Sequence, residues 1–164
     1  MLYAAYGSNL HPLRLERRIA SARLLGTAAL DGYALHFHKR SVDGSGKCSI
    51  ERGPGGVHVA IYELDESGLQ RLDRIEGVGI GYERVTVEVP GFGACSSYTA
   101  DPAYVDGRLQ PYDWYREMVI RGGRYHGFPD AYIERVSAVN ALPDPDLQRS
   151  EANWEIVNGL SFSR

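Results

Sequence analysis

One carboxylate, Glu76, attracts attention because of the helix face on which it is predicted to lie. On a wheel of about 100° per residue with Leu69 at zero, Leu72 falls near ~300° and Glu76 near ~340°. Glu76 therefore shares the apolar stripe, and it lies in the last turn, where the helix dipole disfavours another negative charge. Both effects favour the neutral carboxyl group, which can then accept and return a proton. The pattern indicates general acid–base chemistry.

The position of Glu76 at a helix end leaves a second interpretation open, in which the side chain turns outward and is simply solvated. Glycines follow at positions 77, 79 and 81. Because glycine lacks a side chain, a ligand or another backbone segment can approach the carboxylate closely there. The glycines favour the acid–base interpretation without excluding the solvated one.

A second candidate is the segment Tyr6-Gly7-Ser8-Asn9-Leu10, where a predicted strand turns into a helix. Free N–H groups at such a turn, with the positive end of the helix dipole behind them, can hold a carboxylate or a developing oxyanion. An ordinary helix N-cap at Ser8 or Asn9, without any ligand, explains the same residues. The segment alone is therefore a weak indication of a binding loop.

Other reactive residue types are less well placed. His36 and His38 share one face of a predicted strand, but no carboxylate or third histidine is suitably spaced to complete a metal site. Ser8 as a nucleophile lacks an evident histidine and acid partner. Cys48 and Cys95 are expected to be buried small residues. No metal site and no cofactor is predicted.

The elements that must position these residues are predicted to be short strands joined mostly by hairpins. Strand signals fall at residues 2–6, 23–30, 33–38, 48–51, 57–64, 85–89 and 94–99. Asp31-Gly32 predicts a hairpin between the second and third of these runs. Helices are predicted at 11–19, 65–76, 111–122 and 129–141, the second capped by Asp65 and ended by Gly77. Five to seven strands and three or four helices indicate an α+β fold with a curled or closed sheet.

Length and composition restrict the class of protein further. The 164 residues predict a single domain, 1–164, with a polar tail from about 143. A net charge of −3 with interspersed charges argues against a dedicated surface for nucleic acid or anionic membranes. No apolar run suits a membrane helix and no signal peptide is evident, which predicts a cytoplasmic protein. The 11 tyrosines against 4 phenylalanines suit a pocket for a small polar ligand.

Three motifs in this order resemble the gamma-glutamylcyclotransferase family (AIG2-like superfamily). They are Tyr6-Gly7-Ser8-Asn9-Leu10, then Leu72-Asp73-Arg74-Ile75-Glu76-Gly77-Val78 with Gly81-Tyr82, and finally Tyr115 to Ile120 followed by Gly122-Gly123, His126-Gly127-Phe128-Pro129 and Tyr132. The similarity spans residues 2 to about 140. It implies a small mixed β-barrel with peripheral helices.

The resemblance also implies roles for matched positions. The loop Tyr6, Gly7, Ser8, Asn9, Leu10 lines the pocket and binds a gamma-glutamyl group through main-chain hydrogen bonds, and Glu76 is the acid–base residue. Tyr82, Tyr98 and Tyr115 match pocket tyrosines, although the spacing from Glu76 to Tyr82 is one residue shorter than in the animal enzymes. Gly122-Gly123 replaces the usual Gly-Ala. The Gly-Ser-Asn loop differs from the Gly-Thr-Leu of the gamma-glutamylamine branch.

The implied reaction is cyclisation of a small gamma-glutamyl substrate without a cofactor. The α-amine attacks the γ-carbonyl, 5-oxoproline forms, and an amino acid or amine leaves. Three alternatives stay open: the same chemistry on a gamma-glutamyl-protected biosynthetic intermediate, a binding domain without catalysis, and a Ser8-dependent amidohydrolase. The sequence does not identify the leaving group. It also leaves the oligomeric state open, and a homodimer is one possibility.

Overall fold

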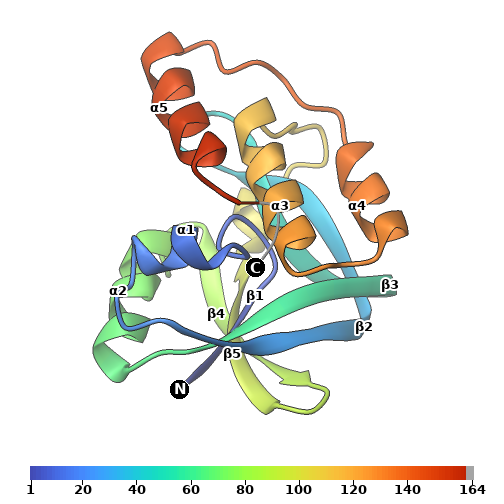
Figure 1. Ribbon diagram of the computed structural model, residues 1–164. Helices are drawn as coiled ribbons and strands as arrows, with labels where there is room; N and C mark the ends of the chain where they lie inside the picture. Colours follow the sequence, from blue (N-terminus) through green and yellow to red (C-terminus); the bar gives the residue numbers. More distant parts are fainter. Residues whose placement is uncertain (162–164) are drawn as a thin grey trace.

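The computed structural model describes residues 1–161, which form one mixed five-stranded sheet and surrounding helices. The strand order is β2-β3-β1-β5-β4. Helices α1 and α2 lie together at one side of the sheet, and α3, α4 and α5 gather at another (Figure 1). The strands are β1 (Leu2–Ala5), β2 (Arg23–Arg40), β3 (Gly46–Glu63), β4 (Tyr82–Val89) and β5 (Gly93–Ala100).

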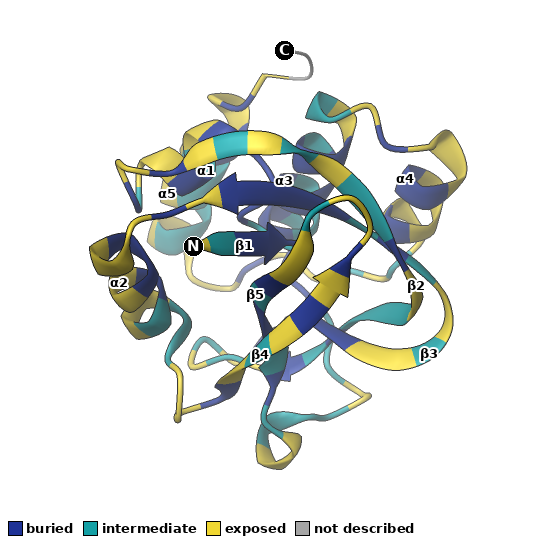
Figure 2. Cartoon of the chain, turned by 90° about the horizontal axis from the view of Figure 1, so that it is seen from below, coloured by how far each residue is buried: buried dark blue, intermediate teal, exposed yellow. Residues whose placement is uncertain are grey.

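The first strand, β1, is the centre of the sheet. It pairs antiparallel with β3, with Tyr3 opposite Tyr62, and parallel with β5, with Tyr3 opposite Ser96. Ala4 and Ala5 are fully buried, and Figure 2 shows β1 enclosed between β3 and β5. Small apolar residues suit this position because both faces of the strand are covered. The loop after β1 therefore starts from a rigid, buried strand.

The hairpin predicted at Asp31-Gly32 is wrong, because β2 runs through it without reversing. Gly32 has a φ of 74° and the register with β3 shifts between Asp31 and Tyr33. A glycine with positive φ beside a register shift is a β-bulge, which bends a strand without reversing it. The partner β3 likewise continues through the Gly53–Gly56 segment, so four predicted strands are two long curved ones (Figure 2).

The closed barrel suggested by the resemblance is not formed by residues 1–161. In the hydrogen-bonded order β2 and β4 are the two edges, and no ladder joins them. The bulged β2–β3 ribbon curves over the core, yet β4 pairs with β5 alone. The fold is therefore α+β with an open mixed sheet.

Helix α1 (Pro12–Glu16) begins later and is shorter than predicted. Its N-cap is His11, whose Nδ1 accepts a hydrogen bond from the Leu13 N–H over 3.2 Å. The predicted caps, Ser8 and Asn9, lie in a separate turn in which the Leu10 N–H donates to the Gly7 carbonyl over 3.0 Å. That turn precedes the helix, so the side chains of the loop are available for other contacts.

Helix α2 (Glu66–Glu76) has the caps that the sequence predicts. Asp65 accepts a hydrogen bond from the Gly68 N–H over 2.6 Å, and Gly77 ends the helix in the left-handed conformation at a φ of 71°. Leu69 and Leu72 are buried. The last residue of the helix, Glu76, is consequently held at a defined position.

The remaining helical elements cover the far side of the loop after β1. Glycine at position 122 in α3 lies against Leu10, so close that an added Cβ would be 2.5 Å from the Leu10 Cβ. None of the helices among residues 1–161 is long and apolar enough to cross a membrane. These elements are the 3₁₀ turn η1 (Pro102–Tyr104) and helices α3 (Asp113–Tyr125), α4 (Asp130–Ser137) and α5 (Leu147–Asn158).

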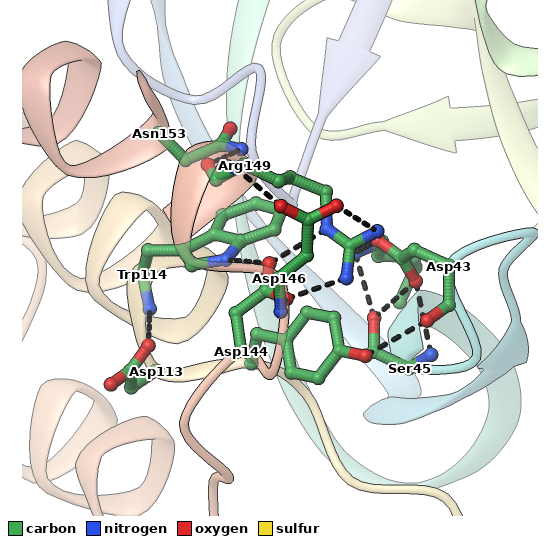
Figure 3. A network of polar contacts seen from close by, with 10 residues as sticks. Asp43, Ser45, Asp113, Trp114, Asp144, Asp146, Arg149 and Asn153 are labelled. Carbon is green, nitrogen blue, oxygen red and sulfur yellow. Dashed lines mark hydrogen bonds and ion pairs between the residues drawn. The ribbon is translucent and has the colours of Figure 1, made fainter. Parts of the chain in front are cut away.

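The segment after residue 143, for which the sequence shows no clear element, forms α5 and a buried polar cluster (Figure 3). Arg149 binds the Asp144 carboxylate through two nitrogens, at 2.7 and 2.5 Å. The Trp114 indole N–H donates to the same carboxylate over 2.9 Å. Because Trp114 belongs to α3, the cluster fastens the C-terminal segment to the helix that carries Tyr115.

Candidate active site

Residues from both halves of the chain meet around one small pocket. The cavity is narrow, with a volume of about 30 Å³, and it opens to solvent at its mouth. The loop after β1, the end of α2, the start of β4, β5 and α3 each contribute. The lining residues are Tyr3, Tyr6, Gly7, Ser8, Asn9, Cys48, Glu76, Tyr82, Tyr98 and Tyr115.

Leu10 is the one predicted site residue that does not line this pocket. Its side chain is fully buried, and its carbonyl accepts hydrogen bonds from the Tyr62 hydroxyl over 2.6 Å and from His126 Nε2 over 2.7 Å. The direction of the chain turns at this residue, from the loop toward α1. Leu10 therefore anchors the loop from beneath.

The Glu76 side chain points inward, as the helical wheel predicts. It is 17% exposed, whereas Arg71 and Arg74 on the other faces of α2 are exposed. Its Oε1 accepts a hydrogen bond from the Asn9 amide nitrogen over 2.9 Å and lies 3.5 Å from Arg18 Nη1. Both contacts use Oε1, so Oε2 is the oxygen that neither partner occupies.

Asn9 connects the loop to this carboxylate. Its amide nitrogen also donates to the Tyr3 hydroxyl over 3.2 Å, and its amide oxygen accepts from Arg18 Nη1 over 3.1 Å. With only 4% of the residue exposed, the amide has one orientation that satisfies all three partners. The side chain thus fixes where the Glu76 carboxylate lies.

Arg18 is a partner of Glu76 that the sequence reasoning missed. It follows the end of α1 and is separated from Glu76 by 58 positions in the chain. The helical wheel of α2 describes only the helix's own residues, so it carries no sign of this contact. The arginine gives the carboxylate a polar, charged neighbour where the wheel alone predicts an apolar one.

A second guanidinium, Arg14 on α1, lies near the same site. Burial, followed by the neighbouring charge of Arg18, lowers the pKa of Arg14 to about 10, while Tyr115 and Glu76 favour its charged form. Its Nε is buried, and no residue of the described part of the chain accepts a hydrogen bond from it. Two guanidinium groups, Arg14 and Arg18, therefore lie near the Glu76 carboxylate.

The pocket tyrosines are held through their hydroxyl groups. Tyr82 donates to the Cys48 carbonyl over 2.6 Å, Tyr115 accepts from the Cys48 N–H over 3.1 Å, and Tyr98 donates to Asp73 Oδ1 over 2.8 Å. Burial raises the pKa of Tyr82 and Tyr115 well above the usual value for tyrosine. These residues are consequently neutral walls with fixed ring positions.

Cys48 and Tyr3 line the pocket although the sequence analysis assigned them no site role. Cys48 is buried, as predicted for a small residue, and burial raises the pKa of its thiol to about 12. A protonated thiol is a poor nucleophile, so its contribution is the backbone that holds Tyr82 and Tyr115. Tyr3 could have been suspected from its place in the strand that leads to the loop.

Among residues 1–161, no group of three or more His, Cys, Asp or Glu side chains is arranged to hold a metal ion. His36 and His38 stack with ring centroids 4.8 Å apart, and His38 faces Glu51 at 3.2 Å.

In this pocket one carboxylate faces the loop between a strand and a helix. Comparison with known families identifies the class of protein that has such a pocket. Residues 3–126 match the family model described as "Gamma-glutamyl cyclotransferase, AIG2-like". Because this match covers well over half of the chain, the protein belongs to that family. Relatives in this family are named gamma-glutamylcyclotransferase, which is the name of an enzyme.

Individual relatives agree with the family model. The gamma-glutamylcyclotransferase of Homo sapiens is 30% identical over 149 residues, covering 84% of this chain and 78% of that protein. The Bos taurus enzyme of the same name is 28% identical over 166 residues, covering 94% and 85%. A solved structure titled "Gamma-glutamyl cyclotransferase" matches with a TM-score of 0.84 at 28% identity, covering 96% of this chain and 98% of the other.

Proposed function

We propose that the protein cyclises gamma-glutamyl compounds, releasing 5-oxoproline and an amino acid or amine, with Glu76 as the acid–base residue. Family membership supports the general cyclotransferase activity. The observation that carries the assignment of Glu76 is its inward carboxylate, held by Asn9 and Arg18 in a pocket that the loop after β1 also lines.

The reaction moves two protons from the attacking nitrogen to the leaving nitrogen. The α-amine of a gamma-glutamyl group is mostly protonated at neutral pH and must lose a proton before it can attack. Glu76 accepts that proton, the amine nitrogen bonds to the γ-carbonyl carbon, and the carbonyl oxygen becomes an oxyanion. When the original C–N bond breaks, Glu76 returns this proton to the leaving nitrogen. Glu76 then accepts the second proton of the cationic ring nitrogen, which leaves a neutral lactam N–H, and that proton passes to the released amine. The free Oε2 is the oxygen we assign to this transfer.

The loop supplies the complementary charge. We assign the N–H groups of Gly7, Ser8 and Asn9 to the substrate carboxylate or to the oxyanion, since backbone donors fixed in advance stabilise developing negative charge. Gly7 permits the close approach, because a Cβ there would already lie 3.1 Å from the Cys48 Cβ. A side chain at this position would occupy part of the pocket.

The tyrosine walls contribute by shape. The nucleophile and the electrophile belong to one molecule, so the enzyme mainly has to hold the substrate in a folded, near-attack conformation. Tyr6, Tyr82 and Tyr115 have hydroxyls bound to backbone groups. Their rings are therefore rigid surfaces against which the five-membered ring can close.

The experiment is to measure 5-oxoproline release from gamma-glutamyl amino acids, gamma-glutamyl amines and glutathione, for the wild type and Glu76→Gln. We expect cyclic product from the wild type and a loss of about 10²- to 10⁴-fold in the variant, the usual contribution of a general acid–base group. Glu66→Gln, an exposed change in the first turn of the same helix, serves as the control. Release of free glutamate in place of 5-oxoproline, or full activity of Glu76→Gln, would overturn the proposal.

A further inference from the structure

Lys39, near the end of β2, is a lysine buried beside the candidate active site. The residue is only 9% exposed. Its Nζ lies 4.5 Å from the centroid of the Tyr82 ring. A Cβ added to Gly81 would lie 2.8 Å from the Lys39 Cε and 3.0 Å from its Nζ. The ammonium group therefore rests against the backbone that follows Glu76 and on the ring of a pocket tyrosine.

The charge of Lys39 is not matched by an ion pair. The chain has two lysines, and Lys47 binds the Asp43 carboxylate over 2.8 Å. Lys39 takes part in none of the ion pairs found within residues 1–161. Buried lysines are rare unless they are paired, because an ammonium group loses its hydration there. The contact with the Tyr82 ring stabilises the charge partly. No group of residues 1–161 accepts a hydrogen bond from Nζ, so its three N–H donors are available to a ligand.

Glycine at position 81 is required for this arrangement. Its φ of 115° belongs to a region that other residues rarely adopt, and any side chain would collide with Lys39. The backbone after Glu76 is thus shaped to admit the lysine. Burial lowers the pKa of Lys39, whereas the nearby charges of Glu76 and Asp43 favour its protonated form.

We propose that Lys39 is a specificity-determining residue whose ammonium group binds a carboxylate on the leaving group of the substrate. This assignment rests on the proposed function. Tyr82 lines the pocket but Lys39 does not, so a gamma-glutamyl group bound at the mouth of the tyrosine-lined pocket leaves Lys39 to the part of the substrate beyond it. A leaving amino acid carries a carboxylate there, and a charged hydrogen bond between the two replaces the missing ion pair. A leaving amine that lacks a carboxylate gives the Lys39 ammonium group no negatively charged partner.

The test compares two substrates of equal size, gamma-glutamyl-alanine and gamma-glutamyl-alaninamide, which differ in one charge. The wild type should have a kcat/KM at least about tenfold higher for the acid, as expected for a charge-assisted hydrogen bond. Lys39→Met should lower kcat/KM for the acid to the level of the amide and leave the amide within about twofold. Arg40→Met changes the adjacent, exposed cation and should keep the wild-type preference.

Binding measurements test the role of Lys39 separately from the proposed reaction. Calorimetric titration of both compounds into Glu76→Gln and into Glu76→Gln/Lys39→Met measures the contribution of Lys39 without turnover, whereas product release by the wild type tests the reaction itself. Thermal unfolding shows that each variant is folded. Equal losses for acid and amide in Lys39→Met, or a wild type that binds and converts both compounds equally, would overturn the assignment of Lys39.

Discussion

The amide nitrogen of Asn9 donates a hydrogen bond to Glu76 Oε1 over 2.9 Å, across 67 positions of the chain. The contact joins the loop after the central strand to the last residue of α2. An amide is suited to this place because it directs the carboxylate without adding a charge. Since Arg18 binds both side chains, the three residues form one unit that sets the direction of Oε2.

Removal of this amide should weaken catalysis more than binding. We expect Asn9→Ala to lower kcat by about 10- to 100-fold, the effect of losing a hydrogen bond to a charged group. Steady-state kinetics of 5-oxoproline release measures it, and Asn140→Ala, at an exposed position, is the matched control. Activity of Asn9→Ala within twofold of the wild type would show that Glu76 needs no such positioning.

Ser8 offers a test of the hydrolase alternative. The cyclisation that we propose uses the main chain of this residue, so Ser8→Ala should keep kcat/KM within about threefold, because the N–H group is unchanged. A serine nucleophile would instead be lost completely on this substitution. The assay separates 5-oxoproline from glutamate by chromatography, and a glutamate product that disappears in Ser8→Ala would favour the hydrolase.

Gly122 should tolerate no side chain. A Cβ there would lie 2.5 Å from the Leu10 Cβ and 3.1 Å from the His11 nitrogen, so Gly122→Ala must push α3 away from the loop. We expect a loss of about 1–3 kcal/mol in the free energy of unfolding, as for other overpacked sites, together with a higher KM. Denaturant unfolding measures the first effect. Gly107→Ala, which meets nothing within 4 Å, is the control and should change neither quantity.

Asp144 should make stability depend on pH in the acid range. Hydrogen bonds from Arg149 and Trp114 hold the pKa of Asp144 at about 2, below its ordinary value. Because the folded-state pKa is the lower one, the carboxylate stabilises the fold at pH values above about 4, and this contribution is lost as the pH falls toward 2. The difference in Tm between the wild type and Asp144→Asn should therefore shrink over that interval.

Thermal unfolding at a series of pH values tests this dependence, with Asp130→Asn at the exposed start of α4 as the reference variant. A difference in Tm that stays constant between pH 6 and 2 would show that the role of Asp144 does not depend on its charge.

Locally encoded features could be predicted well from the sequence. Helix α2 has its cap at Asp65 and its stop at Gly77 because both signals act within a few residues. The inward direction of Glu76 follows from the same helix. The motif resemblance added Tyr82, Tyr98 and Tyr115, which come together in the pocket although no pattern of spacing connects them.

The failures concern features that depend on distant partners. A glycine with positive φ serves a turn and a bulge equally well, and only the pairing of Asp31 with Gly56 on β3 makes Gly32 a bulge. Arg18 and Lys39 were not identified as site residues for the same reason. The sequence around a charged residue does not show which carboxylate or aromatic ring from another segment lies next to it in the fold. His11 was not predicted as the N-cap because the turn at Gly7–Leu10 shifts the start of α1 to a later position in the chain.

The central place of β1 has a consequence for how activity is acquired during synthesis. Among β1–β5, strand β1 is synthesised first, yet it needs neighbours that come much later, as in the hydrogen bond from the Ser97 hydroxyl to the Ala4 carbonyl, 93 positions away. Tyr115 comes later still. Such non-local pairing slows folding, because the chain loses entropy when a long loop closes before the stabilising contacts have formed. A nascent chain therefore has no complete pocket until α3, which carries Tyr115, has been synthesised.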